Sequence, residues 1–335
     1  RNLVRIAGRI GLVVGSLALA AALLAWVFHD FDASEVLAAV RRLSWGEWAT
    51  IIAAFAALLV AEAVLAAAFV PGLSIGRGAI TFLATSAVTS VVPGPSDYPL
   101  RYRMLRSWGY DAGVAATAGA GPTVFNSAHK LVMPLVAAVA LWLGDVRVAG
   151  VGRLLAVACA VLLAVSALVA FVVGTEARTR AAGGVVAKLV RKPVAEPIVR
   201  ARNQAVALAR QRWKRAVFGE VLVVTASVVL FVACMRGVGL PAERASWPAL
   251  LCVWAMVRAV SALPTTPGDI GVSELVYVSL IGQVAGLGWV NTITAGVVVY
   301  RLMTFFAPVP LGLAAFGLWR WTVRPSVAVD RPARS

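Results

Sequence analysis

The segment Ser261–Glu274 places prolines, glycines and carboxylates between two apolar runs, where a membrane helix would otherwise continue. These residues are Pro264, Pro267, Gly268, Asp269, Gly271 and Glu274. A broken backbone at membrane depth persists only where protein or a water-filled cavity shields it. Helix ends at such breaks bind ions and charged substrates. We therefore expect this segment to line a polar binding site.

A looser version of the pattern occurs earlier, in the segment Val88–Asp97. Its polar end contains Pro93, Gly94 and Asp97. The carboxylate can cap a short helix that follows, since Pro99 suits a first helical turn. Arg101 and Arg103 on that helix carry guanidinium groups, which match lipid phosphates. One interrupted segment in each half of the chain indicates a transport pathway.

Ionisable residues also lie within the apolar runs themselves. They are Glu62, His129, Lys130, Arg258 and Arg301. Each such group at a helix centre costs about 2.5–3.5 kcal/mol on insertion scales, so these residues need partners or a wet cavity. We expect carboxylates to pair with cations, and the sequence leaves open which pairs form. The carboxylates are Glu62, Asp97, Asp269 and Glu274, and the cations are Lys130, Arg258 and Arg301.

Two of these residues have both a structural and a functional interpretation. Glu274 falls in the first turn of a helix predicted to run to about residue 285, where it can cap free amides or bind a cation or proton. Arg301 is too deep in its run to reach the surface easily. It can bridge to Glu274 or Asp269, or it can contact substrate.

Together these patterns predict a substrate-binding set and no catalytic set. The expected substrate-binding residues are Asp97, Arg101, Arg103, Lys130, Arg258, Asp269, Glu274, Arg301 and Glu62. The expected structural residues are Pro93, Gly94, Pro264, Pro267, Gly268 and Gly271. The sequence contains no grouping of nucleophile, base and orienting residue, no metal-ligand cluster and no nucleotide motif, so we expect neither an enzyme nor a cofactor.

The composition is that of an integral membrane protein. Hydrophobic residues make up 61% of the chain, charged residues only 14%, and the mean hydropathy is +0.87. The net charge is +16. The basic residues concentrate at the ends of apolar runs and in one loop, which indicates cytoplasmic loops facing anionic lipid rather than nucleic-acid binding.

The predicted fold is an all-α polytopic membrane protein. A crossing needs about 20 apolar residues, and six runs qualify: 10–28, 48–70, 112–143, 151–173, 216–235 and 290–318. Two further stretches, 79–108 and 246–285, are interrupted, and we expect each to form a re-entrant helix pair. The fold therefore has about six spanning helices plus two re-entrant pairs.

We expect residues 1–335 to form a single membrane domain with both termini in the cytoplasm. The basic loop 176–215 should also be cytoplasmic and contain an amphipathic helix at the lipid surface. This topology makes the two broken segments enter from opposite sides. Residues 48–143 and 216–318 would then be the two halves of an inverted repeat.

The motif residues resemble a known family. Pro264, Pro267, Gly268, Gly271 and Glu274, followed by Tyr300, Arg301, Pro310 and Gly312, resemble the flippase-like membrane family typified by the lysylphosphatidylglycerol synthase transmembrane region. Asp269 stands where that family has a second glycine. In the first half, Pro93, Ser96, Asp97 and Arg101 are similar to its Pro, Gly-Asp and Arg pattern, and His129-Lys130 falls near its Glu-Arg pair.

The resemblance implies a lipid translocase that moves an anionic or aminoacylated phospholipid, or a lipid-linked carrier, between leaflets. A membrane-embedded lipid-modifying enzyme, and a membrane anchor for a soluble synthase domain outside this chain, are the alternatives. The expected partners are the lipid, a second copy of the chain and a soluble synthase domain outside this chain. The expected location is a bacterial-type plasma membrane. The lipid, the direction of transport and the coupling ion stay open.

Overall fold

The computed structural model describes residues 33–91, 97–144, 151–190, 195–261, 269 and 271–323. Within these ranges the regular secondary structure is entirely helical, with no β-strand, which confirms the expected all-α class. The expected first span, 10–28, lies outside the described residues. So do the motif residues Pro93, Gly94, Pro264, Pro267 and Gly268.

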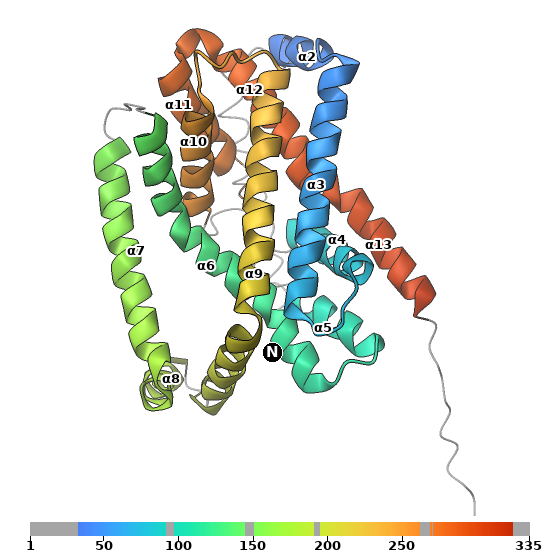
Figure 1. Ribbon diagram of the computed structural model, residues 1–335, viewed down its shortest axis with the longest axis vertical. Helices are drawn as coiled ribbons and strands as arrows, with labels where there is room; N and C mark the ends of the chain where they lie inside the picture. Colours follow the sequence, from blue (N-terminus) through green and yellow to red (C-terminus); the bar gives the residue numbers. More distant parts are fainter. Residues whose placement is uncertain are drawn as a thin grey trace, which may run out of the picture.

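The described helices pack into a bundle of long and short elements (Figure 1). Their bounds are α2 Ala33–Arg41, α3 Trp45–Phe69, α4 Ile75–Val91, α5 Asp97–Ser107, α6 Ala112–Gly144, α7 Val151–Gly174, α8 Glu176–Val190, α9 Ala195–Gly237, α10 Trp247–Val260, α11 Val272–Ala285, η2 Leu287–Trp289, α12 Val290–Arg301, η3 Leu302–Phe306 and α13 Pro308–Thr322.

Among the described residues, three helical stretches are long and apolar enough to cross a bilayer. They are Trp45–Phe69, Arg212–Gly237 and Leu287–Thr322. Shorter apolar helices are Ala128–Gly144, Trp247–Val260 and Val272–Ala285. Each of the three long stretches overlaps an expected span. The total of six spans stays a prediction.

The helices α3 and α9 run side by side through the centre of the bundle and form its core (Figure 1). Ile51 of α3 and Phe231 of α9 are fully buried there. Lipid tails are as apolar as leucine, so close packing around small residues holds membrane helices together. Gly219 of α9 shows this, because a Cβ added to it would lie 3.0 Å from the Cα of Leu65 in α3.

The two interrupted segments each form two helices separated by a break. The first pair is α4 and α5, in the lower half of the view, and the second is α10 and α11, in the upper half (Figure 1). α10 packs on α6, and Trp254 at its centre is 1% exposed. A helix buried on every side can be apolar all round.

Two described residues just before α11 have a backbone conformation that few residues adopt. The C-cap residue Ser261 donates its Oγ to the carbonyl of Arg258 at 2.9 Å. Asp269 has a φ of 56° and Gly271 a φ of 86°. Positive φ costs little for glycine and is tolerated by aspartate better than by most residues. Gly271 is therefore required where it stands, and α11 begins directly after it.

The last long helical stretch changes its winding immediately after Arg301. Residues Leu302–Phe306 form a π-helix, in which the amide of Ala307 donates to the carbonyl of Leu302 at 2.8 Å. Pro308 has no amide hydrogen to continue the regular ladder. π-helical turns inside longer helices are frequent at functional sites.

The basic loop is helical along most of its described length. It contains α8 and the first half of α9, which continues into the membrane stretch without a break. Arg202 donates to the carbonyls of Val173 and Gly174 at 2.9 and 3.1 Å, and Arg212 donates to the carbonyl of Ala68 at 3.2 Å. Cations near helix C-termini satisfy free carbonyls there. These arginines therefore fasten the loop to α7 and α3.

Exposed tryptophans mark both ends of the bundle. Trp45 and Trp247 begin α3 and α10 at the upper end of the view, and Trp321 lies beside the last residue of α13 at the lower end (Figure 1). Trp45 is 92% exposed and Trp321 is 71% exposed. Tryptophan is enriched where a protein meets the two interfaces of a bilayer.

The contact between α13 and α4 gives a test of the packing. A Cβ on Gly312 would lie 2.3 Å from the carbonyl oxygen of Leu83, whereas one on Gly317 would meet nothing within 4 Å. Overpacking costs about 1–3 kcal/mol, so Gly312→Ala should lower the thermal unfolding temperature in detergent by several degrees. Gly317→Ala, the matched control on the same helix, should leave it unchanged or higher. Equal unfolding temperatures would contradict this contact.

Candidate functional site

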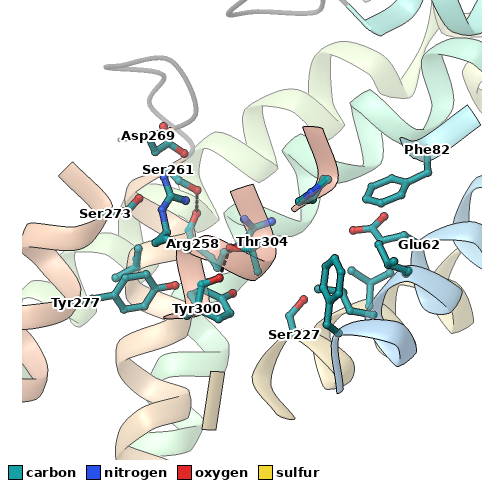
Figure 2. Close-up of a pocket in the computed structure, with 17 residues that line it drawn as sticks. Glu62, Phe82, Ser227, Arg258, Ser261, Asp269, Ser273, Tyr277, Tyr300 and Thr304 are labelled. Atoms are coloured by element: carbon teal, nitrogen blue, oxygen red, sulfur yellow. Dashed lines mark hydrogen bonds between the residues drawn. The ribbon is translucent and has the colours of Figure 1, made fainter. Parts of the chain in front are cut away.

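A polar cavity of about 160 Å³ lies inside the helix bundle. Its charged lining residues are Glu62 of α3, Arg258 of α10, Asp269 of the break and Arg301 of α12. Figure 2 shows Arg258, Ser261, Asp269 and Ser273 on one side of the cavity and Glu62 with Phe82 on the other. A volume of this size holds several water molecules, since one water needs roughly 10–15 Å³ by this measure.

Hydroxyl groups complete the wall of the cavity. They come from Ser227, Ser261, Ser273, Tyr277, Tyr300 and Thr304. These residues belong to α9, the second broken segment, α12 and the π-helix, whereas Phe82 belongs to α4 of the first pair. Helices from both halves of the chain therefore meet at one cavity.

The carboxylate of Glu274 joins α11 to α12. Its Oε1 accepts from Nε of Arg301 at 2.5 Å, and its Oε2 accepts from the amide of Gly271 at 2.7 Å. The capping and the bridging roles expected for these residues are therefore both present. The pair is well buried, with side chains 9% and 15% exposed. The ion pair holds Arg301 in the cavity wall. Glu274 itself does not line the cavity.

Arg258 carries a positive charge into the cavity, where Glu62, Glu220 and Asp269 lie within electrostatic range but form no described ion pair with it. Its Nε is buried and has no hydrogen-bond partner among the described residues. The guanidinium carbon lies 5.9 Å from the ring centre of Trp254, on the same helix. This Nε–H could donate a hydrogen bond to an anion in the cavity.

Lys130 reaches the second break from α6. Its Nζ donates to the carbonyl of Ser261 at 2.8 Å, at the C-terminus of α10. A cation at this position complements the helix dipole and satisfies a free carbonyl. Lys130 and Arg258 therefore bring two positive charges to the same end of α10.

The first broken segment contributes an ion pair beside the cavity. Asp97 and Arg101 are four residues apart on α5, and their side chains meet at 2.8 Å. Both residues are buried, and Arg101 lies within electrostatic range of Glu62. Arg103 lies on the same helix but is exposed and does not line the cavity. Its expected contact with a headgroup stays a prediction.

Three titratable residues gather close to the cavity in the core of the bundle. Nδ1 of His129, on α6, lies 3.0 Å from Oε1 of Glu220, on α9, and Glu62 lies within electrostatic range of Glu220. Within the described part of the chain, no group of three His, Cys, Asp or Glu has the geometry of a metal site.

The family of this protein is known from its sequence as a whole. Residues 13–312 match the family described as the lysylphosphatidylglycerol synthase TM region. The chain belongs to this family. The match spans nearly the whole sequence and includes every residue of the cavity. No curated protein matches closely enough to count as a relative. As a member of the lysylphosphatidylglycerol synthase TM family with long apolar helices, the chain is an integral membrane protein with a role in lipid handling.

Sequence reasoning missed Glu220 in this family member. The run 216–235 was treated as plainly apolar, although Glu220 interrupts it. The rule that identified Glu62, a carboxylate inside an apolar run, applies equally to Glu220. The hydroxyls of Ser273 and Tyr277 carried no such signal, because serine and tyrosine occur widely in membrane helices.

The buried ion pair gives a second test. Removing one partner of such a pair costs about 3–5 kcal/mol, because the other charge stays buried alone. We expect Glu274→Gln and Arg301→Gln each to lower the thermal unfolding temperature strongly. The double variant should lose less than the sum of the two losses.

The exposed pair Arg180–Glu176 provides the control, since its side chains are 54% and 47% exposed. Arg180→Gln should change stability by only about 0–1 kcal/mol. Additive losses in the Glu274 and Arg301 cycle would mean that the two side chains do not interact in the folded protein.

Proposed function

We propose that this protein is a lipid translocase, which moves a phospholipid with an anionic or aminoacylated headgroup, or a lipid-linked carrier, between the two leaflets. The observation that supports this most is the polar cavity with Arg258 in its wall. A charge at this depth is costly unless it has a function or a partner. A headgroup passing through the protein would supply that partner.

The charges of the cavity suit a phosphate headgroup. Arg258 would bind the phosphate, since a guanidinium can donate two parallel hydrogen bonds to it. Lys130 would add positive charge nearby. The carboxylates of Glu62 and Asp269 would balance the empty site and would favour an ammonium group on the same headgroup. The acyl chains would stay in the bilayer outside.

The two helix pairs suggest how access would alternate. α4 with α5, and α10 with α11, lie in opposite halves of the bundle (Figure 1). In the proposal they are re-entrant pairs of an inverted repeat, and one repeat rocks against the other around the cavity. The π-helix after Arg301 and the following Pro308 would allow α12 and α13 to bend relative to each other.

The distribution of basic residues supports an orientation. α5, α8 and the start of α9 are rich in arginine and lie in the lower half of the view (Figure 1). We propose that this end faces the cytoplasm of a bacterial-type cell and that the protein resides in the plasma membrane. A second copy of the chain or a soluble synthase domain would be partners in the same membrane.

A leaflet-resolved assay tests this function. Purified protein is reconstituted into liposomes with fluorescent phosphatidylglycerol, and a reductant that cannot cross the membrane reports how much probe reaches the outer leaflet. Protein should accelerate this movement. Arg258→Gln should slow it by about tenfold, because a charged hydrogen bond contributes about 1.5–3 kcal/mol and 1.4 kcal/mol is a factor of ten.

The matched control is Arg320→Gln, which removes an exposed arginine on α13. It should leave the rate unchanged, and all variants should unfold near the same temperature. Absence of movement with every lipid class would contradict the translocase. Chemical alteration of the lipid, detected by mass spectrometry, would favour the membrane-embedded enzyme. Unaltered and immobile lipid would favour the anchor.

A further inference from the structure

His129 and Glu220 make a buried contact that the cavity itself does not use. Nδ1 of the imidazole lies 3.0 Å from Oε1 of the carboxylate, and the side chains are 8% and 11% exposed. The two atoms are not aligned as a hydrogen bond, and neither has another hydrogen-bond partner among the described residues. Two buried polar atoms therefore face each other across one short gap.

This arrangement requires a hydrogen between the two atoms. An unprotonated imidazole nitrogen and an ionised carboxylate oxygen both present lone pairs, which repel at 3.0 Å. A proton on either atom turns the repulsion into attraction, and a rotation of the imidazole about its ring torsion would align the bond. Burial makes an unpaired charge or lone pair costly. The neutral imidazole can supply this hydrogen from its Nδ1–H tautomer, and the imidazole and the carboxylate together have room for one further proton.

Charges on the neighbouring helices set when the proton is held. Glu62 on α3 lies within electrostatic range of Glu220, and Arg258 on α10 lies within range of all three residues. Lys130, next in sequence, acts on His129. Arg101 on α5 lies within electrostatic range of Glu62. On α12, Arg301 is engaged by Glu274.

We propose that His129 and Glu220 form a proton-binding site that couples proton movement to lipid movement, with Glu62 as the exchange point on the cavity wall. This inference rests on the proposed function. The step is a transfer of one proton from the cavity water through the carboxylate of Glu62 to the His129–Glu220 contact. No other bond is made or broken.

Arg258 links the proton to the lipid. While the cavity is empty, the guanidinium favours ionised carboxylates at Glu62 and Glu220. A phosphate docked on Arg258 cancels that charge, so the carboxylates then bind a proton more readily. Binding linkage is reciprocal, and the proton in turn strengthens the binding of the anionic lipid. Lipid and proton would therefore cross the membrane in the same direction.

A sodium ion fits this contact less well. Hard cations take several oxygen ligands, whereas one of the two facing atoms here is an imidazole nitrogen. The carboxylates of Glu62 and Glu220 also lie on different helices, and Arg258 is within electrostatic range of both. The test separates the two ions by exchanging sodium for choline.

The experiment counts protons taken up when lipid binds. Dioctanoyl phosphatidylglycerol is titrated calorimetrically into the purified full chain in PIPES and in imidazole, two buffers whose ionisation heats differ widely. The wild type should take up close to one proton for each lipid bound. Glu220→Gln should reduce this uptake by at least half while lipid still binds. His129→Gln should do the same, and it decides the question if Glu220→Gln fails to fold.

Glu176→Gln is the control, because Glu176 is an exposed carboxylate far from the cavity in sequence and fold. It should retain the wild-type uptake. Three results would overturn the coupling while leaving lipid transport intact: lipid binding without proton uptake, equal uptake in both Glu220 forms, or a dependence on sodium. Absence of both lipid binding and leaflet movement in the wild type would overturn the translocase and the coupling together.

Discussion

The ion pair between Glu274 and Arg301 is the interaction on which the site depends. A charge inside a lipid-surrounded bundle must be satisfied by the protein itself or by enclosed water. Glu274 meets this requirement twice, because it caps the start of α11 at Gly271 and binds Arg301 of α12. The two short helices α11 and α12 are thereby held in a fixed position relative to each other. Both helices contribute residues to the wall of the cavity, so this ion pair positions that part of the wall.

The same requirement orders the remaining charges. Asp97 pairs with Arg101 on one helix, and Lys130 satisfies a carbonyl at the end of α10. Arg258 is different, because its side chain lines the cavity and forms no ion pair with a described carboxylate. Glycines elsewhere in the bundle let its helices pack closely, as at Gly219 and Gly312. The π-helix after Arg301 interrupts the regular winding of the last helical stretch.

Local chemistry explains which features the sequence could predict. Glycines, prolines and carboxylates between apolar runs predicted both breaks, and Glu274 was expected in the first turn of a helix ending near residue 285, where α11 does end at Ala285. Charges inside apolar runs identified Glu62, Arg258 and Arg301, which line one cavity.

The partners of these charges could not be predicted, because pairing depends on how helices far apart in sequence rotate against each other. Asp97 with Arg101 was the exception that sequence could have given, since residues four apart share a helix face. Glu220 was missed although it obeyed the rule that identified Glu62.

The central claim is that a lipid headgroup enters the cavity and engages Arg258. The most direct measurement is an experimental structure of the protein in a lipid nanodisc containing phosphatidylglycerol. The account predicts a phosphate within hydrogen-bonding distance of the Arg258 guanidinium, with the acyl chains directed out of the bundle. A cavity filled by side chains or acyl chains, with phosphates only at the outer surface, would contradict it.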